Sequence, residues 1–263
     1  MDFLTLKKRY QNSEAFNDHL HKVFTEKTAE NEWLSMHRKH VEENNLGYGD
    51  SAFHYMWLVI LTFLQNAQPT KTITIMEIGV FKGQVISLWS LIKNKIGLQA
   101  NIHAVSPFRG NPQPRNKLLY RLMLNFSKKF RSFHASANFY ENEDYMAIVK
   151  NHFATHQLDF NNIILHKGFS TDPSILQTLN KEKFDLIYID GDHTFEGVMA
   201  DIKNLSPLIA SGGIMVMDDA SNNIPGSTFW KGHQQVSDAC EIIPDLGFIN
   251  VFNIGHNRVY QKI

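Results

Sequence analysis

Cysteine and long apolar runs are both scarce in this sequence of 263 residues. The single cysteine, Cys240, excludes an internal disulfide framework and suits a reducing compartment. Its thiol could be a nucleophile, but a buried position in a helix is the simpler interpretation. The most apolar run, 53–64, is too short for a bilayer, which needs about 20 residues. The N-terminus shows no apolar stretch of signal-peptide length, so we expect a cytoplasmic protein that does not engage a membrane.

An overall excess of charge is also missing. Lysine and arginine number 26, aspartate and glutamate also number 26, and the net charge is zero. This balance gives no indication of a nucleic-acid partner. Locally, the stretch between 106 and 140 holds seven basic residues and no acid: Arg109, Arg115, Lys117, Arg121, Lys128, Lys129 and Arg131. This basic insertion, at about 107–150, could be a solvated helix face. It could also be a lid over an anionic acceptor such as a phosphorylated or nucleotide-linked sugar.

The first part of the chain, 1–68, is rich in good helix formers and carries apolar residues at helical spacing. We predict an N-terminal helical extension, of which the apolar run 53–64 is a buried helix. Such helices could cover the core of the following domain or form a homo-oligomer contact. The sequence leaves both roles open.

From residue 69 onward, strands alternate with helices. Five apolar runs that end at turn residues are predicted strands: 72–79, 101–107, 162–168, 184–190 and 212–219. Helical patterns between them, clearest at 194–209, indicate a parallel sheet covered on both faces. Two further runs, 247–254 and 257–263, are separated by only two residues and must pair as an antiparallel hairpin. We therefore predict a doubly wound α/β domain over 69–263, with a mostly parallel seven-stranded sheet that ends in this hairpin.

The turn after the first predicted strand reads Glu77-Ile78-Gly79-Val80-Phe81-Lys82-Gly83. Open α/β sheets bind ligands at the carboxyl ends of their strands, and Gly79 and Gly83 allow a tight turn and close approach to a ligand. The third glycine of the dinucleotide fingerprint is missing, and the Glu77 carboxylate would repel a pyrophosphate. An acid at this place suits a cationic ligand, which favours S-adenosylmethionine over NAD. A tight turn without a ligand is the alternative.

Acidic residues follow the fourth and fifth predicted strands. Asp190 ends the fourth, and Asp218 and Asp219 end the fifth. These strand ends share one edge of the sheet, so the carboxylates can converge, and their mutual repulsion then calls for a cation. Oxygen ligands suit Mg²⁺ or Mn²⁺. His193 could accept the proton of a hydroxyl group near neutral pH. Capping of the next helices is the alternative for these side chains.

Three motifs, E-I-G-V-F-K-G, Y-I-D-G-D-H-T-F-E-G-V and M-V-M-D-D, occur in this order. Together they resemble the class I S-adenosylmethionine-dependent methyltransferases, and among these the metal-dependent macrocin O-methyltransferase and cephalosporin hydroxylase-like family, over roughly 70–262. The resemblance implies a Rossmann-like methyltransferase fold. It also implies S-adenosyl-L-methionine and Mg²⁺ (or Mn²⁺) as cofactors, and methyl transfer to a hydroxyl of a saccharide or other small molecule.

The same resemblance implies roles for individual residues. The cofactor side comprises Glu77, Gly79 and Gly83 at the methionine part, Ser106 at the ribose, Ser170 at the adenine, and Asp190. The metal ligands are Asp190, Asp218 and Asp219, and the base is His193. The family usually has an acid at the position of Ser106, and many members have Gly-Asp-Ser where this chain has Gly168-Phe169-Ser170.

Two other functions stay open at this stage. Relatives named as hydroxylase-like indicate that the fold could serve another reaction. A catalytically degenerate domain for binding or assembly is favoured by Ser106 and Phe169, whereas the complete acid cluster and His193 favour an enzyme. The loop 221–235 could close over a sugar with Trp230, and within it His233 is either a second catalytic residue or a histidine satisfied by the loop.

Overall fold

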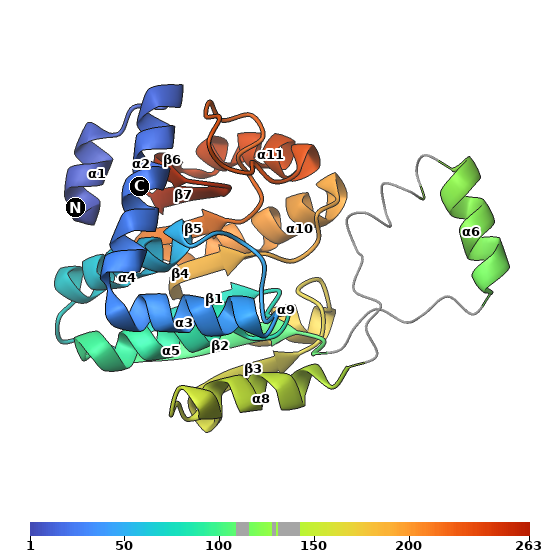
Figure 1. The fold of residues 1–263 in the computed structure, drawn as a ribbon, viewed down its shortest axis with the longest axis horizontal. Helices are drawn as coiled ribbons and strands as arrows, with labels where there is room; N and C mark the ends of the chain where they lie inside the picture. The colour runs from blue at the N-terminus through green and yellow to red at the C-terminus, as the bar shows by residue number, and fades with distance from the viewer. Residues whose placement is uncertain (109–115, 128–129, 131–142) are drawn as a thin grey trace.

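The computed structural model describes residues 1–108, 116–127, 130 and 143–263. A seven-stranded sheet forms its centre, with the strand order β3-β2-β1-β4-β5-β7-β6. The strands are β1 (Ile73–Ile78), β2 (Ala100–Ser106), β3 (Ile163–Lys167), β4 (Phe184–Ile189), β5 (Ile209–Met217), β6 (Phe248–Ile254) and β7 (Asn257–Lys262). Strands β1 to β5 pair in parallel, and β7 pairs antiparallel with both β5 and β6. The predicted doubly wound α/β fold and its closing hairpin are confirmed (Figure 1).

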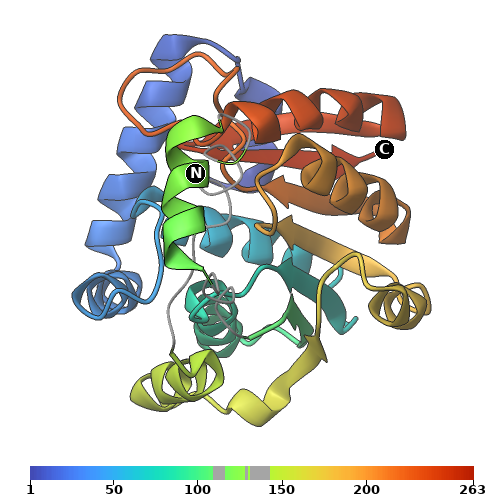
Figure 2. The ribbon, with the colours of Figure 1, turned by 90° about the vertical axis from the view of Figure 1, so that its right-hand side faces the viewer.

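Helices cover both faces of the sheet (Figure 2). Each face has its own apolar core. One face is covered by α1 (Phe3–Arg9), α2 (Glu14–Glu30), α3 (Glu32–Glu43), α4 (Ala52–Ala67), α5 (Gln84–Ile96) and α8 (Tyr145–Thr155). The other is covered by α9 (Pro173–Leu179), α10 (Phe195–Leu205) and α11 (Gln234–Ala239). Short 3-10 turns are η1 (Phe160–Asn162), η2 (Ser206–Leu208) and η3 (Cys240–Leu246). This sandwich leaves the carboxyl ends of the strands free to carry a site.

The N-terminal helices cover the core of the sheet. Leu20, Phe24 and Leu34 are completely buried, and they belong to the same apolar cluster as Trp57 of α4 and Tyr188 of β4. The extension and the sheet therefore share one core, and a role of these helices in an oligomer stays a prediction. None of the described helices is both long and apolar enough to cross a membrane.

Two element boundaries differ from the sequence prediction. The helix expected over 194–209 ends at Leu205 and passes into the 3-10 turn η2, because Pro207 has no N–H to donate to the preceding turn. Strand β5 begins at Ile209, which pairs with Phe184, and not at Gly212. The buried position predicted for Cys240 is confirmed, since its side chain is fully buried.

The basic insertion is described only in part. Helix α6 (Lys117–Phe126) stands away from the sheet in Figure 1 and exposes several apolar side chains, among them Leu118 and Phe126. Of the seven basic residues in the insertion, five lie outside the described residues: Arg109, Arg115, Lys128, Lys129 and Arg131. Its role toward an anionic acceptor stays a prediction.

The buried imidazole of His103, paired with the partly exposed His166, makes the stability of the fold depend on pH. His103 Nδ1 lies 3.0 Å from His166 Nε2, and burial, followed by the nearby His166, lowers the pKa of His103 to about 4. The unfolded chain takes up a proton near pH 6.5, whereas the folded chain does not. The free energy of unfolding therefore has its full value above pH 6.5, and it decreases as the pH falls toward 4.

We expect His103→Gln to reduce this pH dependence. Allowing for residual solvent screening, the wild type should lose about 1 kcal/mol more of its free energy of unfolding than the variant between pH 7.5 and pH 5. Urea denaturation at both pH values measures the difference. Equal losses in the two proteins would contradict the assignment.

Candidate active site

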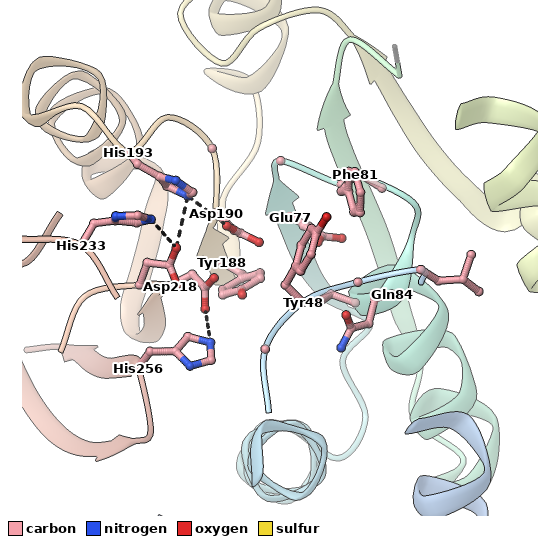
Figure 3. Close-up of a pocket in the computed structure, with 18 of the residues that line it drawn as sticks. Tyr48, Glu77, Phe81, Gln84, Tyr188, Asp190, His193, Asp218, His233 and His256 are labelled. Carbon is pink, nitrogen blue, oxygen red and sulfur yellow. Dashed lines mark ion pairs between the residues drawn. The ribbon is translucent and has the colours of Figure 1, made fainter. Parts of the chain in front are cut away.

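A cavity of about 470 Å³ lies at the carboxyl ends of the central strands. Its walls come from the β1 and β4 ends, the end of β5, the loop before α4, and the turn between β6 and β7 (Figure 3). The polar and aromatic lining includes Tyr48, Glu77, Phe81, Gln84, Tyr188, Asp190, His193, Asp218, Asp219, Trp230, His233 and His256. The carboxylates predicted from the motifs thus face one space.

Backbone hydrogen bonds that continue the sheet pattern fix the first two carboxylates. The N–H of Asp190 donates to the carbonyl of Ile78 at 2.9 Å, and the N–H of Asp218 donates to the carbonyl of Ile189 at 3.0 Å. Each acid is the first residue after its strand, so the parallel register sets the spacing between them. Gly79 makes this junction possible, because a Cβ there would lie 1.7 Å from the carbonyl oxygen of Asp190.

Asp219 has a backbone conformation that few non-glycine residues adopt. Its φ is +51°, in the left-handed region, where aspartate is better tolerated than most residues. Its carbonyl accepts from the N–H of His233 at 2.9 Å, and the N–H of the next residue, Ala220, donates to the carbonyl of His256 at 2.8 Å. Gly232 packs against this backbone so closely that a Cβ would lie 2.2 Å from Asp219. The fold therefore imposes the conformation, as is common at functional sites.

Three histidines surround the carboxylates of Asp218 and Asp219 (Figure 3). His193 Nε2 lies 3.4 Å from Asp219 Oδ2 and 3.7 Å from Asp190 Oδ1. His233 Nε2 lies 3.6 Å from Asp219 Oδ2, and its ring stacks on that of His193 with centroids 4.7 Å apart. His256 Nε2 lies 3.2 Å from Asp218 Oδ1.

The carboxylates differ in how readily they ionise. Burial, and then the negative charge of Asp218, raises the pKa of Asp190 well above its usual range and that of Asp219 to about 7. Burial would raise the pKa of Asp218 as well, but His256 and the hydroxyl of Tyr188 hold it below its usual range. Burial disfavours the charged form of His256, yet Asp218 raises the pKa of His256 to about 9. At neutral pH Asp218 and His256 therefore form an ion pair, whereas burial and the charge of Asp218 disfavour ionisation of Asp190.

The donor set fits a divalent cation. Two groups offer ligand atoms within 4.8 Å of one another: His193, Asp219 and His233, and Asp218, Asp219 and His256. A cation among these oxygens would offset the repulsion between the clustered carboxylates. The buried Nε2 of His193 makes no hydrogen bond to any described residue, so its lone pair is open either to a cation or to the proton of a substrate. Asp190 belongs to neither group, so its predicted role as a ligand stays a prediction. Carboxylates with nearby imidazoles suit Mn²⁺ better than Mg²⁺.

Glu77 also fits its predicted cationic ligand. Its side chain is almost fully buried, and its Oε2 has no hydrogen-bond partner among the described residues. Burial, and then the charge of Asp190, raises the pKa of Glu77 well above its usual range. An ammonium group in the cavity would supply both the missing donor and the compensating charge.

Three predicted cofactor residues lie outside the lining of the cavity. Gly83 begins α5 with φ +88° and faces Val149 of α8, which leaves no room for a Cβ. Ser106 Oγ accepts a hydrogen bond from the N–H of Phe108 at 3.3 Å. The hydroxyl of Ser170 donates a hydrogen bond to the carboxylate of Asp201. Contact of these residues with a cofactor stays a prediction.

Sequence reasoning missed His256 and the loop before α4. His256 lies in the two-residue turn of the hairpin, and it reaches Asp218 because β7 pairs with β5. The hairpin and the acid pair were both visible in the sequence, but the strand order that joins them was not. Tyr48 comes from the extension and stacks on Phe81 with ring centroids 5.6 Å apart. No motif marked it.

Comparison with known proteins agrees with this geometry. Residues 76–220, more than half of the chain, match a family described as a methyltransferase domain. The chain belongs to this methyltransferase family. No curated protein matches the sequence of this methyltransferase domain.

Solved structures give the same fold at low identity. The O-methyltransferase NovP is 15% identical, with 80% of this chain and 78% of that chain covered and a TM-score of 0.55. The calicheamicin methyltransferase CalS11 is 17% identical, with 79% of each chain covered and a TM-score of 0.52. The SAH-bound methyltransferase PaMTH1 of Podospora anserina is 14% identical, with coverage of 87% and 84% and a TM-score of 0.51. At these identities the likeness establishes the methyltransferase fold.

Proposed function

We propose that this chain is an S-adenosylmethionine- and divalent-metal-dependent O-methyltransferase, and that its acceptor is a hydroxyl of a saccharide or another small molecule. The observation that carries the proposal is the meeting of Glu77, the three aspartates and His193 around one cavity. The names of two similar structures, the O-methyltransferase NovP and the calicheamicin methyltransferase CalS11, agree with it.

In this proposal the residues of the chain divide the work between two sides of the cavity. Glu77 binds the ammonium group of the methyl donor, and Asp190, Asp218 and Asp219 hold the metal. When bound, S-adenosylmethionine supplies the methyl group and the metal supplies Lewis acidity toward the acceptor oxygen. His193 Nε2 accepts the proton of the acceptor hydroxyl, and Asp219 Oδ2, 3.4 Å away, stabilises the imidazolium that results.

The contacts of His193 support its role as the base. Its ring stacks on His233, which Trp230 meets edge-on with centroids 5.6 Å apart, so an aromatic wall fixes the imidazole. Trp230 lines the cavity and is 57% exposed, so an acceptor sugar could pack on it. The proposed preference for an anionic or nucleotide-linked sugar rests on the positive charge of the basic insertion.

We expect His193→Gln to lower kcat by about 10²- to 10⁴-fold, the usual contribution of a general base. A methyl-transfer assay over nucleotide sugars and phenols, with Mn²⁺ and with a chelator, measures it. The dissociation constant of S-adenosylmethionine should stay within about threefold of the wild type.

The control for this experiment is His19→Gln, at an exposed position of α2, which should leave kcat unchanged. A His193→Gln enzyme with the wild-type kcat would refute the assigned base. Turnover that persists with a chelator would refute the dependence on metal.

One observation favours the alternative of a binding or assembly domain. No residue of β2 lines the described part of the cavity, and Ser106 and Ser170 use their hydroxyls elsewhere. Failure of both S-adenosylmethionine and Mn²⁺ to bind the folded protein would decide for this alternative. Metal binding without cofactor binding would favour a hydroxylase-like reaction.

A further inference from the structure

A second cluster of histidines lies apart from the cavity, where the N-terminal extension meets the methyltransferase domain. Five of the 13 histidines of the chain take part. His37 and His40 come from α3, His54 from α4, His152 from α8, and His156 directly follows α8 as its C-terminal cap. Their rings pack against one another with centroids between 4.8 and 5.2 Å apart. None of the five lines the cavity.

We propose that His37, His152 and His156 bind one Zn²⁺ ion. Each offers a ring nitrogen, and the three ligand atoms lie within 4.8 Å of one another. His152 lies in the last turn of α8, and His156, four residues later, is the residue that caps the C-terminal end of this helix. Their rings meet edge-on with centroids 5.2 Å apart, and two histidines four residues apart are a spacing that zinc sites use. His37 completes the group from α3, with its ring stacked on that of His156 at 4.8 Å.

The hydrogen bonds leave lone pairs available for an ion. Ser87 Oγ donates to the carbonyl of Gln84 at 3.0 Å. The hydroxyl has one proton, so we assign the Nε2 atoms of His152, at 2.7 Å, and of His37, at 3.0 Å, as donors to it. This tautomer of His152 places its lone pair on Nδ1, which is buried and has no partner among the described residues. The buried Nε2 of His156 also has none. Buried ring nitrogens without a partner are costly, and a metal ion bound to the lone pair of each would remove that cost.

The third ligand has supporting contacts of its own. His37 is completely buried, with Nδ1 3.1 Å from His54 Nε2 and Nε2 3.0 Å from Ser87 Oγ. Binding through one nitrogen replaces one of these bonds, and the other bond keeps the ring oriented, as outer contacts do in metal sites. Burial lowers the pKa of His37 well below its usual range and that of His152 to about 3, so both rings are neutral and able to ligate.

The donor set indicates the metal. All three ligands are imidazoles, which suit Zn²⁺ and not Mg²⁺. With Zn–N bonds of about 2.0–2.1 Å, tetrahedral ligand atoms lie about 3.4 Å apart. Ligand atoms that lie up to 4.8 Å apart therefore have to approach one another by at most about 1.4 Å. A fourth position stays open for water. The ion would join α3 of the extension to α8 of the domain, and it would stabilise the folded chain in proportion to its affinity.

The test uses the untagged full-length protein after dialysis against a chelator, with Zn²⁺ alone as the titrant in calorimetry. The Asp219→Asn background removes a shared ligand of the other candidate metal groups. In the Asp219→Asn protein we expect one Zn²⁺ to bind per chain, and we expect a higher Tm with Zn²⁺ than without it. His156→Gln should lower this affinity at least about 100-fold, since even outer-shell changes cost roughly 10- to 100-fold. Co²⁺ should give the absorption of a tetrahedral site in the Asp219→Asn protein and lose it with His156→Gln.

His156 is the position of choice because it is only half-buried, so its replacement leaves the core intact. The matched control is His166→Gln, which removes one ring of the His103–His166 pair and no member of a three-ligand group among the described residues. It should bind Zn²⁺ as the Asp219→Asn parent does. Absence of Zn²⁺ binding in that parent, or equal affinity after His156→Gln, would overturn the proposal.

Discussion

Asp219→Asn is expected to weaken Mn²⁺ binding by at least about 100-fold and to abolish metal-dependent turnover. Asp219 is the acid shared by both groups of candidate ligands at the cavity. An amide in its place removes a negative charge and one oxygen ligand, and loss of even an outer-shell contact costs roughly 10- to 100-fold in affinity. Calorimetric titration with Mn²⁺ measures the affinity, and the methyl-transfer assay measures turnover.

The control for this change is Asp192→Asn in the same loop as His193. Asp192 is exposed and accepts hydrogen bonds from the N–H and the hydroxyl of Thr194, both at 2.9 Å. It supports the loop, so this variant should keep the wild-type affinity for Mn²⁺ within about threefold. Unchanged Mn²⁺ binding in Asp219→Asn would exclude Asp219 as a ligand.

Gly79→Ala is expected to destabilise the fold by more than about 4 kcal/mol, a loss typical of severe core disruption. Its φ is +92°, and the new Cβ would lie 1.7 Å from the backbone oxygen of Asp190. The clash can be relieved only if the β1 and β4 ends separate, because the obstructing atom belongs to the backbone. The site would then lose its geometry together with its stability. Urea denaturation measures the effect.

Gly97→Ala separates the clash from the strain of a left-handed backbone. Gly97 ends α5 with φ +70°, and no atom lies within 4 Å of a Cβ placed there. The variant should therefore lose only about 1–2 kcal/mol, the cost of the left-handed conformation alone. Similar losses of unfolding free energy in the two variants would contradict the claim that a clash with Asp190 destabilises the Gly79→Ala protein.

The sequence was sufficient for the fold because its signals are local. Near-continuous apolar strands such as 184–190, and a two-residue connection at Gly255 and His256, define a parallel sheet with an antiparallel edge. The ends of helices were harder to predict than their existence, as the end of α10 at Leu205, before Pro207, shows. The packing of α2 and α3 on the sheet core was one of two open alternatives, since an amphipathic pattern does not say what its apolar face covers.

The site was predictable where its residues lie in short motifs at the carboxyl ends of strands. Asp190, Asp218 and Asp219 belong to short motifs whose convergence follows from parallel topology alone. His256 depends on the position of the hairpin beside β5, and the zinc cluster depends on the packing of α3 against α5 and α8. Such encounters join residues up to 119 positions apart, from His37 to His156, and no local pattern encodes them.

Binding of S-adenosylmethionine to the cavity is the claim on which the proposed function depends most. A calorimetric titration of the full chain with S-adenosylmethionine in the presence of Mn²⁺ tests it directly. We expect one molecule bound per chain with a dissociation constant of about 1 mM or tighter, the range of enzyme substrates, and at least tenfold weaker binding to Glu77→Gln. Absence of binding to the folded wild-type protein would contradict the account.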